Sequence, residues 1–356
     1  MSRFLNSIYQ TLDAYTPGEQ PKDGANIKLN TNESPYPAGP ATVKAVTDAR
    51  QAARLRLYCD PDAVALKDAL AERYGVKRSN VFVSNGSDDI LNFSFMAFAQ
   101  DGVLFPEITY GFYPVFGDLH GVEYTRVPLK EGFFVDPEDY KGKGKMIVLA
   151  NPNAPTGRAL GLDVIAEFCE SDPDHVILID EAYIDFGGIS AVPLTAKYEN
   201  LLVVQTFSKS RSLAGARLGY AIASETLIND LERIKYSTNP YNVNTVSAAA
   251  GTAALSEPEY YRENCRKIME TREYSAGRLK ELGFEVIPSV ANFLFVSNPK
   301  IDGKEFYLEL KERRILIRHF DNPAITQYNR ITVGTREEMD QLFAAIRDIL
   351  DRKEEK

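Results

Sequence analysis

The chain has 356 residues, with 41 Lys and Arg against 50 Asp and Glu, and a formal net charge of −9. Its length predicts about two domains, which can bury a core without metal or disulfide staples. The acidity argues against a surface dedicated to nucleic acid or an anionic membrane, because both need clustered Lys and Arg. The three cysteines and three histidines are unclustered, and the start has no apolar signal segment. We therefore expect a cytoplasmic protein with no disulfide framework, no metal site and no membrane span.

Short apolar runs alternate with amphipathic stretches over the first two thirds of the chain. This rhythm predicts a mostly parallel sheet covered on both faces by helices, an α/β architecture. Such sheets place their sites at the carboxyl ends of the strands. The predicted strands are 81–83, 103–105, 145–150, 176–179 and 201–204, and the helices between them are 88–100, 110–119 and 162–170.

The pattern changes after about residue 240, where a smaller α+β unit is predicted. The first 30 residues have no clear period, so we expect an N-terminal arm at 1–30, a large α/β domain at 31–240 and a small domain at 241–356. The elements predicted in the small domain are helices 242–255, 260–282, 303–313 and 337–352, and strands 285–287, 292–296, 315–318 and 330–333.

Lys209 directly follows a predicted buried strand and lies between two groups of anion-binding residue types. A solvent-poor strand end lowers the pKa of a lysine, and such a lysine can act as a Schiff-base nucleophile. Thr206, Ser208 and Arg217 could hold an anion beside it. The alternative is an ordinary surface lysine at a strand end.

Asp180 ends another apolar run and is a poor core residue unless it meets a cation. It could pair with a protonated pyridine nitrogen, and Tyr183 could donate to a phenolate oxygen three residues later. The alternative is a capping Asp at a strand–loop junction. Residues 151–157 form a proline-rich loop after strand 145–150. Ser87 and Asp88 open a helix, where they could serve a bound phosphate or simply cap the helix.

In order and spacing, these four segments resemble the fold-type-I pyridoxal-phosphate (PLP) aminotransferases. The resemblance implies a large domain with a mostly parallel sheet between helices, plus a smaller α+β domain. It makes Lys209 the Schiff-base lysine and acid/base catalyst, and Arg217 the phosphate arginine. Asp180 becomes the partner of the pyridine nitrogen, and Tyr183 the donor to the ring hydroxyl oxygen O3′.

Within that family, four further stretches resemble the histidinol-phosphate aminotransferases: LNTNESPYP at 29–37, LYCDP at 57–61, NGSDD at 85–89 and RITVGTR at 330–336. One departure is Ala154, where the family usually has an Asn before Pro-Thr-Gly. Either Asn153 reaches the cofactor, or Tyr183 binds O3′ alone.

The resemblance also implies contacts to the cofactor and the substrate. Besides Lys209, Asp180 and Tyr183, the cofactor would be held by Ser87, Asp88, Tyr110, Asn153, Thr206, Ser208, Arg217 and, from the other subunit of a homodimer, Tyr58. Tyr110 would stack on the ring; the alternative is an aromatic residue packed in the core. The resemblance does not decide whether Thr206 or Ser208 makes the main contact with the phosphate. The substrate side would be formed by Tyr15 of the partner subunit, Asn32, Arg318 and Arg330, since arginines suit phosphate and carboxylate.

The implied reaction converts L-histidinol phosphate and 2-oxoglutarate to imidazole-acetol phosphate and L-glutamate by a ping-pong route through a Schiff base on Lys209. This reaction belongs to histidine biosynthesis. Alternatives are an aromatic or broad-specificity aminotransferase and a threonine-phosphate decarboxylase. A non-enzymatic regulator domain is not expected, because the signature begins by Leu29 and leaves no DNA-binding region before it.

Overall fold

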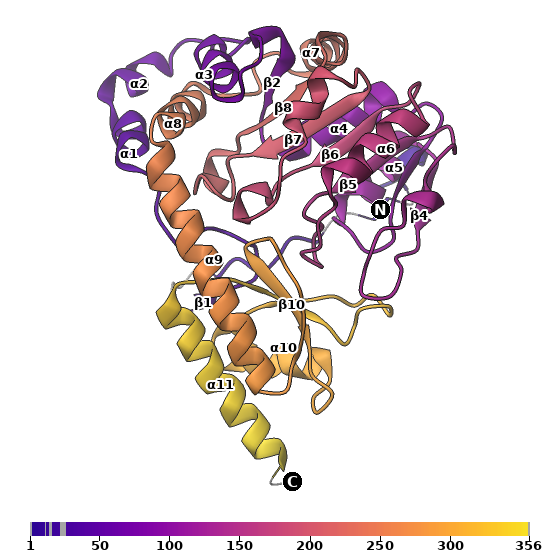
Figure 1. Ribbon diagram of the computed structural model, residues 1–356. Helices are drawn as coiled ribbons and strands as arrows, with labels where there is room; N and C mark the ends of the chain where they lie inside the picture. The colour runs from indigo at the N-terminus through magenta and orange to yellow at the C-terminus, as the bar shows by residue number, and fades with distance from the viewer. Residues whose placement is uncertain (1, 11, 14–15, 22–25, 355–356) are drawn as a thin grey trace.

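The computed structural model describes residues 2–10, 12–13, 16–21 and 26–354, with the side chain of Glu354 excepted. Two layered units are stacked along the long axis, and the helix α9 (Pro258–Glu281) runs beside both of them (Figure 1). Among the described residues, no helix combines the length and apolar character needed to cross a bilayer.

The upper unit is built on a seven-stranded sheet with the order β2-β8-β7-β6-β5-β3-β4. Strands β3 to β7 are mutually parallel, whereas β8 runs antiparallel to both of its neighbours. The strands are β2 (Val81–Ser84), β3 (Val103–Pro106), β4 (Tyr124–Val127), β5 (Met146–Ala150), β6 (Ile177–Asp180), β7 (Leu201–Thr206) and β8 (Gly219–Ala223).

Successive residues of the central strands enter two different cores, one on each face of this sheet. Ile177 and Ile179 belong to one buried cluster, and Leu178 belongs to the other. Both faces are covered by helices, which explains the continuous apolar runs. The helices of this unit are α1 (Pro40–Thr47), α2 (Ala49–Arg54), α3 (Val64–Tyr74), α4 (Ser87–Phe98), α5 (Phe112–His120), α6 (Leu162–Ser171), α7 (Glu225–Thr238) and α8 (Thr245–Leu255).

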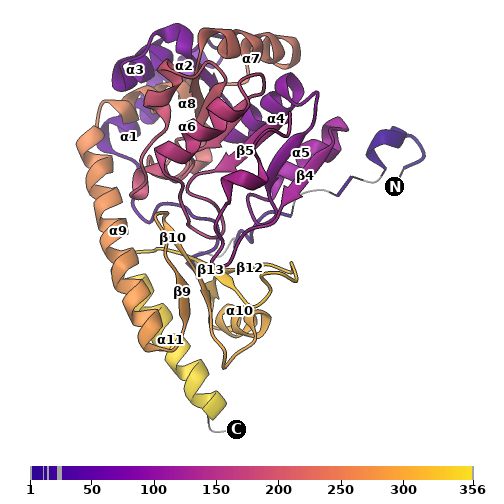
Figure 2. The same ribbon diagram turned by 45° about the vertical axis from the view of Figure 1, so that its right-hand side comes forward.

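The lower unit is a four-stranded antiparallel sheet, β12-β13-β10-β9, packed against helices (Figure 2). A short parallel pair joins β1, near the N-terminus, to β11. The elements are β1 (Ile27–Lys28), β9 (Glu285–Ile287), β10 (Phe293–Ser297), α10 (Gly303–Glu312), β11 (Ile315–Leu316), β12 (Arg318–His319), β13 (Asn329–Thr332) and α11 (Arg336–Glu354).

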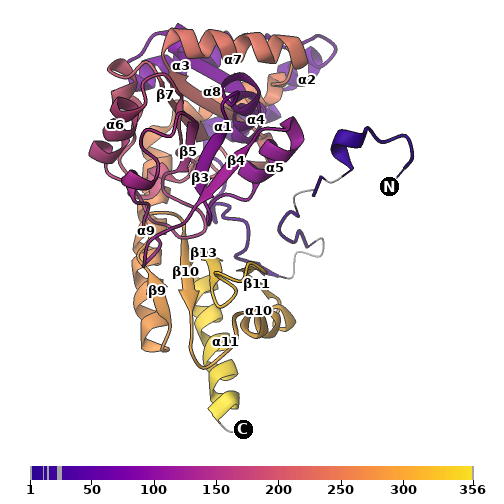
Figure 3. The same ribbon diagram turned by 90° about the vertical axis from the view of Figure 1, so that its right-hand side faces the viewer.

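The predicted fold class is confirmed: a mostly parallel sheet between helices, with a smaller α+β unit. The domain boundaries stay a prediction. The packing of helix α9 shows how the two units are joined. Tyr261 in α9 belongs to a core of the large sheet, whereas Leu279 in the same helix belongs to the core of the small unit. Residues 7–9 form a short 3-10 helix that lies to one side of both units (Figure 3).

Candidate functional site

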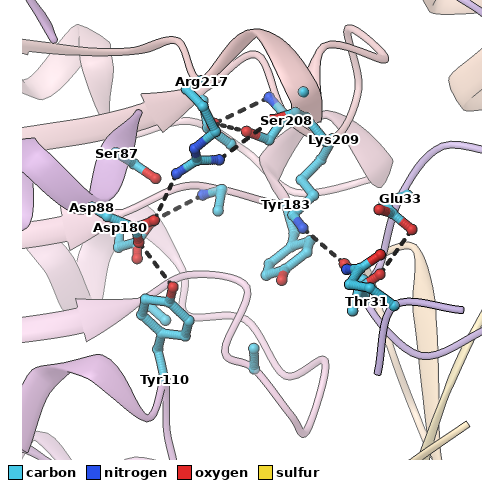
Figure 4. Close-up of a pocket in the computed structure, with 17 residues that line it drawn as sticks. Thr31, Glu33, Ser87, Asp88, Tyr110, Asp180, Tyr183, Ser208, Lys209 and Arg217 are labelled. Carbon is cyan, nitrogen blue, oxygen red and sulfur yellow. Dashed lines mark hydrogen bonds and ion pairs between the residues drawn. The ribbon is translucent and has the colours of Figure 1, made fainter. Parts of the chain in front are cut away.

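The parallel strands β5, β6 and β7 end side by side and open into a cavity of about 340 Å³. Lys209 and Tyr183 lie in its middle (Figure 4). Arg217 and Asp88 are on one side of them, and Thr31 is on the other. The cavity therefore brings the residues predicted at separate strand ends into one place.

Lys209 reaches across the cavity toward the N-terminal segment. Its Nζ donates a hydrogen bond of 3.0 Å to the backbone oxygen of Thr31, and it lies 5.7 Å from the centre of the Tyr183 ring. Glu33 also lines the cavity, on the same side as Thr31. Thr31 and Glu33 were not predicted as cavity residues, although both belong to the 29–37 signature.

Asp180 is a buried carboxyl group at the end of β6, only 4% exposed. Tyr113 Oη donates to its Oδ2 at 3.0 Å, and the backbone N–H of Ala182 donates to its Oδ1 at 3.2 Å. Burial raises the pKa of Asp180 to about 6, and the two hydrogen bonds oppose that rise. A buried carboxylate facing a cavity suits a cationic ring nitrogen. Sequence reasoning missed Tyr113; the signal available was a tyrosine on the buried face of helix α5, since buried tyrosines need a partner for the hydroxyl.

The first turn of α4 and Arg217 form a cradle for an anion. The N-cap residue of α4, Gly86, has φ +90°, and a Cβ there would lie 2.7 Å from Arg217 Nη2. Across the sheet edge, a Cβ at Gly219 would lie 2.4 Å from the backbone N of Ser87. Both glycines thus let Arg217 and the helix N-terminus approach closely, an arrangement that suits a phosphate. Arg217 Nη2 lies 2.8 Å from Asp88 Oδ2.

Thr206 and Ser208 both line the cavity and are hydrogen-bonded to each other. Thr206 Oγ1 donates to Ser208 Oγ at 2.9 Å and accepts from the backbone N–H of Ser208 at 3.1 Å. Thr206 Oγ1 also lies 3.4 Å from the Leu218 backbone oxygen, a second acceptor for its hydrogen. Tyr110 lines the cavity as predicted, and its Oη donates to Asp88 Oδ1 at 2.8 Å.

The loop after β5 places Ala154, not Asn153, in the cavity wall. The amide Nδ2 of Asn153 donates to the Ile108 backbone oxygen at 3.0 Å and to Thr156 Oγ1 at 3.1 Å, and its Oδ1 accepts from Thr109 at 2.8 Å. These bonds hold Asn153 behind the wall. Of the two possibilities left open for this loop, the structure favours Tyr183 acting without an amide at this point.

A second cavity of about 280 Å³ adjoins the first, and Tyr110 and Ala154 line both. Arg318 and Arg330 line it from β12 and β13, where they are directly opposite one another in the register. Arg126 at the edge strand β4 also lines this cavity and was missed by sequence reasoning, because β4 was not recognised as a strand.

Besides Asn153, two predicted site residues lie outside both cavities. Asn32 is fully buried and does not line either cavity; its Nδ2 donates to Tyr183 Oη at 3.0 Å. Tyr58 is 83% exposed and stacks on Tyr241, with ring centres 4.6 Å apart. Tyr15 lies outside the described residues.

The chemistry of this donor set fits PLP. An amine, a buried carboxylate and a tyrosine hydroxyl surround a space next to a phosphate cradle built from Arg217, a helix N-terminus and hydroxyl groups. Each group matches one part of the cofactor: the aldehyde carbon, the ring nitrogen, the ring hydroxyl and the phosphate.

Comparisons with known proteins agree with this geometry. The model of the family "Aminotransferase class I and II" matches residues 25–346. The histidinol-phosphate aminotransferase of Brachyspira hyodysenteriae is 48% identical over 98% of this chain and 99% of its own length. A solved structure described as a putative histidinol-phosphate aminotransferase from Erwinia carotovora atroseptica is 25% identical, with a TM-score of 0.86 over 95% of this chain and 99% of that one.

A further solved structure supports the fold. The histidinol-phosphate aminotransferase of Sinorhizobium meliloti, in complex with pyridoxal-5′-phosphate, is 24% identical, with a TM-score of 0.83 over 91% of each chain. Class I and II aminotransferases depend on PLP. The cavity around Lys209, the family match over most of the chain and the full-length relative together show that this chain belongs to the class I and II aminotransferases, as a PLP-dependent transaminase of the histidinol-phosphate aminotransferase group.

Proposed function

We propose that the chain transfers the amino group of L-histidinol phosphate to 2-oxoglutarate, giving imidazole-acetol phosphate and L-glutamate in two half-reactions of histidine biosynthesis. The observation that carries this proposal is the second cavity, in which Arg318 and Arg330 stand beside the Lys209 cavity. The name of a full-length relative, histidinol-phosphate aminotransferase, supports the same substrate.

In this proposal, the first cavity would hold PLP. Arg217, Ser208 and the N-terminal turn of α4 would hold its phosphate, and Thr206 is hydrogen-bonded to Ser208. Asp180 would stabilise a proton on the ring nitrogen, and Tyr183 would donate to the ring hydroxyl oxygen. Tyr110 would pack against the ring.

When bound, PLP supplies an electron sink for the negative charge that develops at the substrate α-carbon. Lys209 would anchor the cofactor, and its amine would act as the general base and acid that moves the α-proton. The Thr31 backbone oxygen, 3.0 Å from Nζ, steadies the lysine when it is not attached. Asp180 needs its charged form for this chemistry, because only a carboxylate stabilises a protonated ring nitrogen.

The paired arginines suit both substrates. A phosphate monoester and the side-chain carboxylate of glutamate each accept two hydrogen bonds from one guanidinium group. Arg330 Nη2 donates to the Asn30 backbone oxygen at 2.9 Å, and Arg318 Nη2 donates to the Thr16 backbone oxygen at 3.4 Å. These contacts hold each guanidinium group at one nitrogen, and both arginines line the second cavity.

The protein acts as a cytoplasmic homodimer in this proposal, and each site is completed by Tyr58 and Tyr15 of the partner subunit. The exposure of Tyr58 and its stacking on Tyr241 support this role, since an exposed aromatic pair is available to another chain. The arm at 1–30, the large domain at 31–240 and the small domain at 241–356 remain our proposed division.

A half-reaction screen tests the substrate. The PLP form is mixed separately with histidinol phosphate, phenylalanine, glutamate and threonine phosphate, and the spectral change to the pyridoxamine form is followed. We expect histidinol phosphate and glutamate to react fastest. Equal rates with phenylalanine would favour a broad-specificity aminotransferase, and carbon dioxide release from threonine phosphate without a keto acid would favour a decarboxylase. Borohydride reduction should fix the cofactor to Lys209.

A further inference from the structure

Asn32 lies directly behind Tyr183, outside the cavity wall. It is fully buried, and its backbone has φ +56°, in the left-handed region. The backbone is held on both sides: its N–H donates to Thr332 Oγ1 at 3.0 Å, and its carbonyl oxygen accepts from Asn292 Nδ2 at 2.9 Å. The Asn32 backbone is thus held by two residues of the small unit, while its side chain also reaches Tyr183 of the large unit.

Thr332 determines which end of the Asn32 amide faces Tyr183. Because Thr332 Oγ1 accepts the backbone N–H of Asn32, its own hydrogen is free to be donated, and it goes to Asn32 Oδ1 at 3.0 Å. The Nδ2 end must then point to Tyr183 Oη, which it approaches at 3.0 Å. Tyr183 accepts this bond, so its own hydroxyl hydrogen is directed elsewhere.

At position 154 the cavity wall has no amide donor, where the family usually has an Asn. Ala154 is 4% exposed and lines the cavity with a methyl group, and the neighbouring Asn153 amide is turned away from it. The ring hydroxyl oxygen of the cofactor therefore relies on Tyr183. A donor that already accepts a hydrogen bond is a stronger donor, since hydrogen bonds in a chain polarise one another.

We propose that Asn32 is a positioning residue for the cofactor: it holds the Tyr183 hydroxyl as a donor toward the ring oxygen and offsets the amide that Ala154 lacks. This role differs from the direct substrate contact expected from the sequence. It rests on PLP binding and does not depend on which amino substrate the enzyme uses.

The visible absorption of the holoenzyme, recorded against pH without substrate, tests the proposal. The pH midpoint of the absorption change depends on how well the protein stabilises negative charge on the ring oxygen of the cofactor. Asn32→Gly keeps the left-handed backbone and removes only the side chain. We expect it to raise the midpoint by about half a pH unit. Tyr183→Phe should raise the midpoint further, and Asn32→Gly should add nothing in the Tyr183→Phe background.

A matched control separates this role from simple loss of packing. Asn329 is also buried in the small sheet, but its Nδ2 donates to the Gly303 backbone oxygen, away from the cavity. Asn329→Gly should lower the unfolding temperature and leave the midpoint where it was. Adding Ala154→Asn to Asn32→Gly should reverse part of the upward shift of the midpoint.

An unchanged midpoint in Asn32→Gly, equal shifts in Asn329→Gly, or additive shifts in the double variant with Tyr183→Phe would each overturn the proposal. If Asn32→Gly does not fold, Thr332→Val removes the group that orients the amide. The same upward shift is then expected, and its absence would count against the role. Because no amino substrate is present, failure of the substrate assignment leaves this test unaffected.

Discussion

Tyr113 Oη donates a hydrogen bond of 3.0 Å to Oδ2 of Asp180, across 67 residues of sequence. Tyr113 is fully buried, and burial next to this carboxylate raises the pKa of its phenol well above the ordinary value. It therefore keeps its hydroxyl hydrogen to a higher pH than an ordinary tyrosine. It stabilises the carboxylate form of Asp180, which the cofactor requires.

Replacing Tyr113 by Phe should weaken cofactor binding. The variant loses one hydrogen bond to a charged group, so we expect the PLP dissociation constant to rise roughly tenfold. The pKa of Asp180 in the cofactor-free protein should also move above about 6. Equilibrium titration of the apoprotein with PLP measures the first effect. Tyr140→Phe is the control, because Tyr140 is equally buried but its hydroxyl has no hydrogen-bond partner among the described residues.

Asp180→Asn should stabilise the cofactor-free protein while impairing function. In the folded state the pKa of Asp180 is raised from 3.8 to about 6, because burial disfavours the charged carboxylate. The contribution of this group to folding stability is therefore fully present below pH 3.8 and is lost as the pH rises through about 6. Removing the charge should therefore add roughly 1–3 kcal/mol to the free energy of unfolding at pH 8. Urea unfolding of the apoprotein at pH 8 and at pH 4 measures this, and the gain should vanish at the lower pH. A gain of equal size at both pH values would contradict the assignment.

Arg217→Gln should act on the cofactor and spare the amino substrate. Its guanidinium faces the N-terminal turn of α4, and loss of a hydrogen bond to a charged group should raise the PLP dissociation constant roughly 10- to 100-fold. At saturating PLP, the KM for histidinol phosphate should stay close to that of the parent. Arg78→Gln, which removes an exposed ion pair with Asp68, should leave both constants unchanged.

Arg318→Gln should weaken substrate binding and slightly stabilise the fold. Arg318 and Arg330 are opposite one another on antiparallel strands, and like charges in that position cost about 0.2–1 kcal/mol. We expect the KM values for histidinol phosphate and glutamate each to rise about tenfold or more, with a small rise in the unfolding temperature.

Arg336→Gln is the control for this pair. Arg336 begins α11, lies over the Tyr274 ring and lines neither cavity. Its substitution should leave both KM values unchanged. If Arg318→Gln raised only one of the two KM values, the shared use of the arginine by both substrates would be wrong.

The sequence by itself determined the class of fold and pointed to the groups that we propose bind the cofactor. Runs such as Ile177–Asp180 are buried on both faces of the sheet, so their apolar pattern is continuous and readable. Lys209, Asp180 and Arg217 could be found because each stands in a short segment at a strand end, and strand ends in such sheets meet at one edge. These signals lie within short stretches of the chain, so they can be recognised from the sequence alone.

The tertiary structure alone decided which side chains act through others. Asn32 meets Tyr183 across 151 residues, and Tyr113 meets Asp180 across 67. Strand β4, which carries Arg126, is a half-exposed edge strand with no continuous apolar run. A hydrogen bond between distant segments has no periodic or local signature, because it exists only once tertiary packing has brought the donor and the acceptor to about 3 Å.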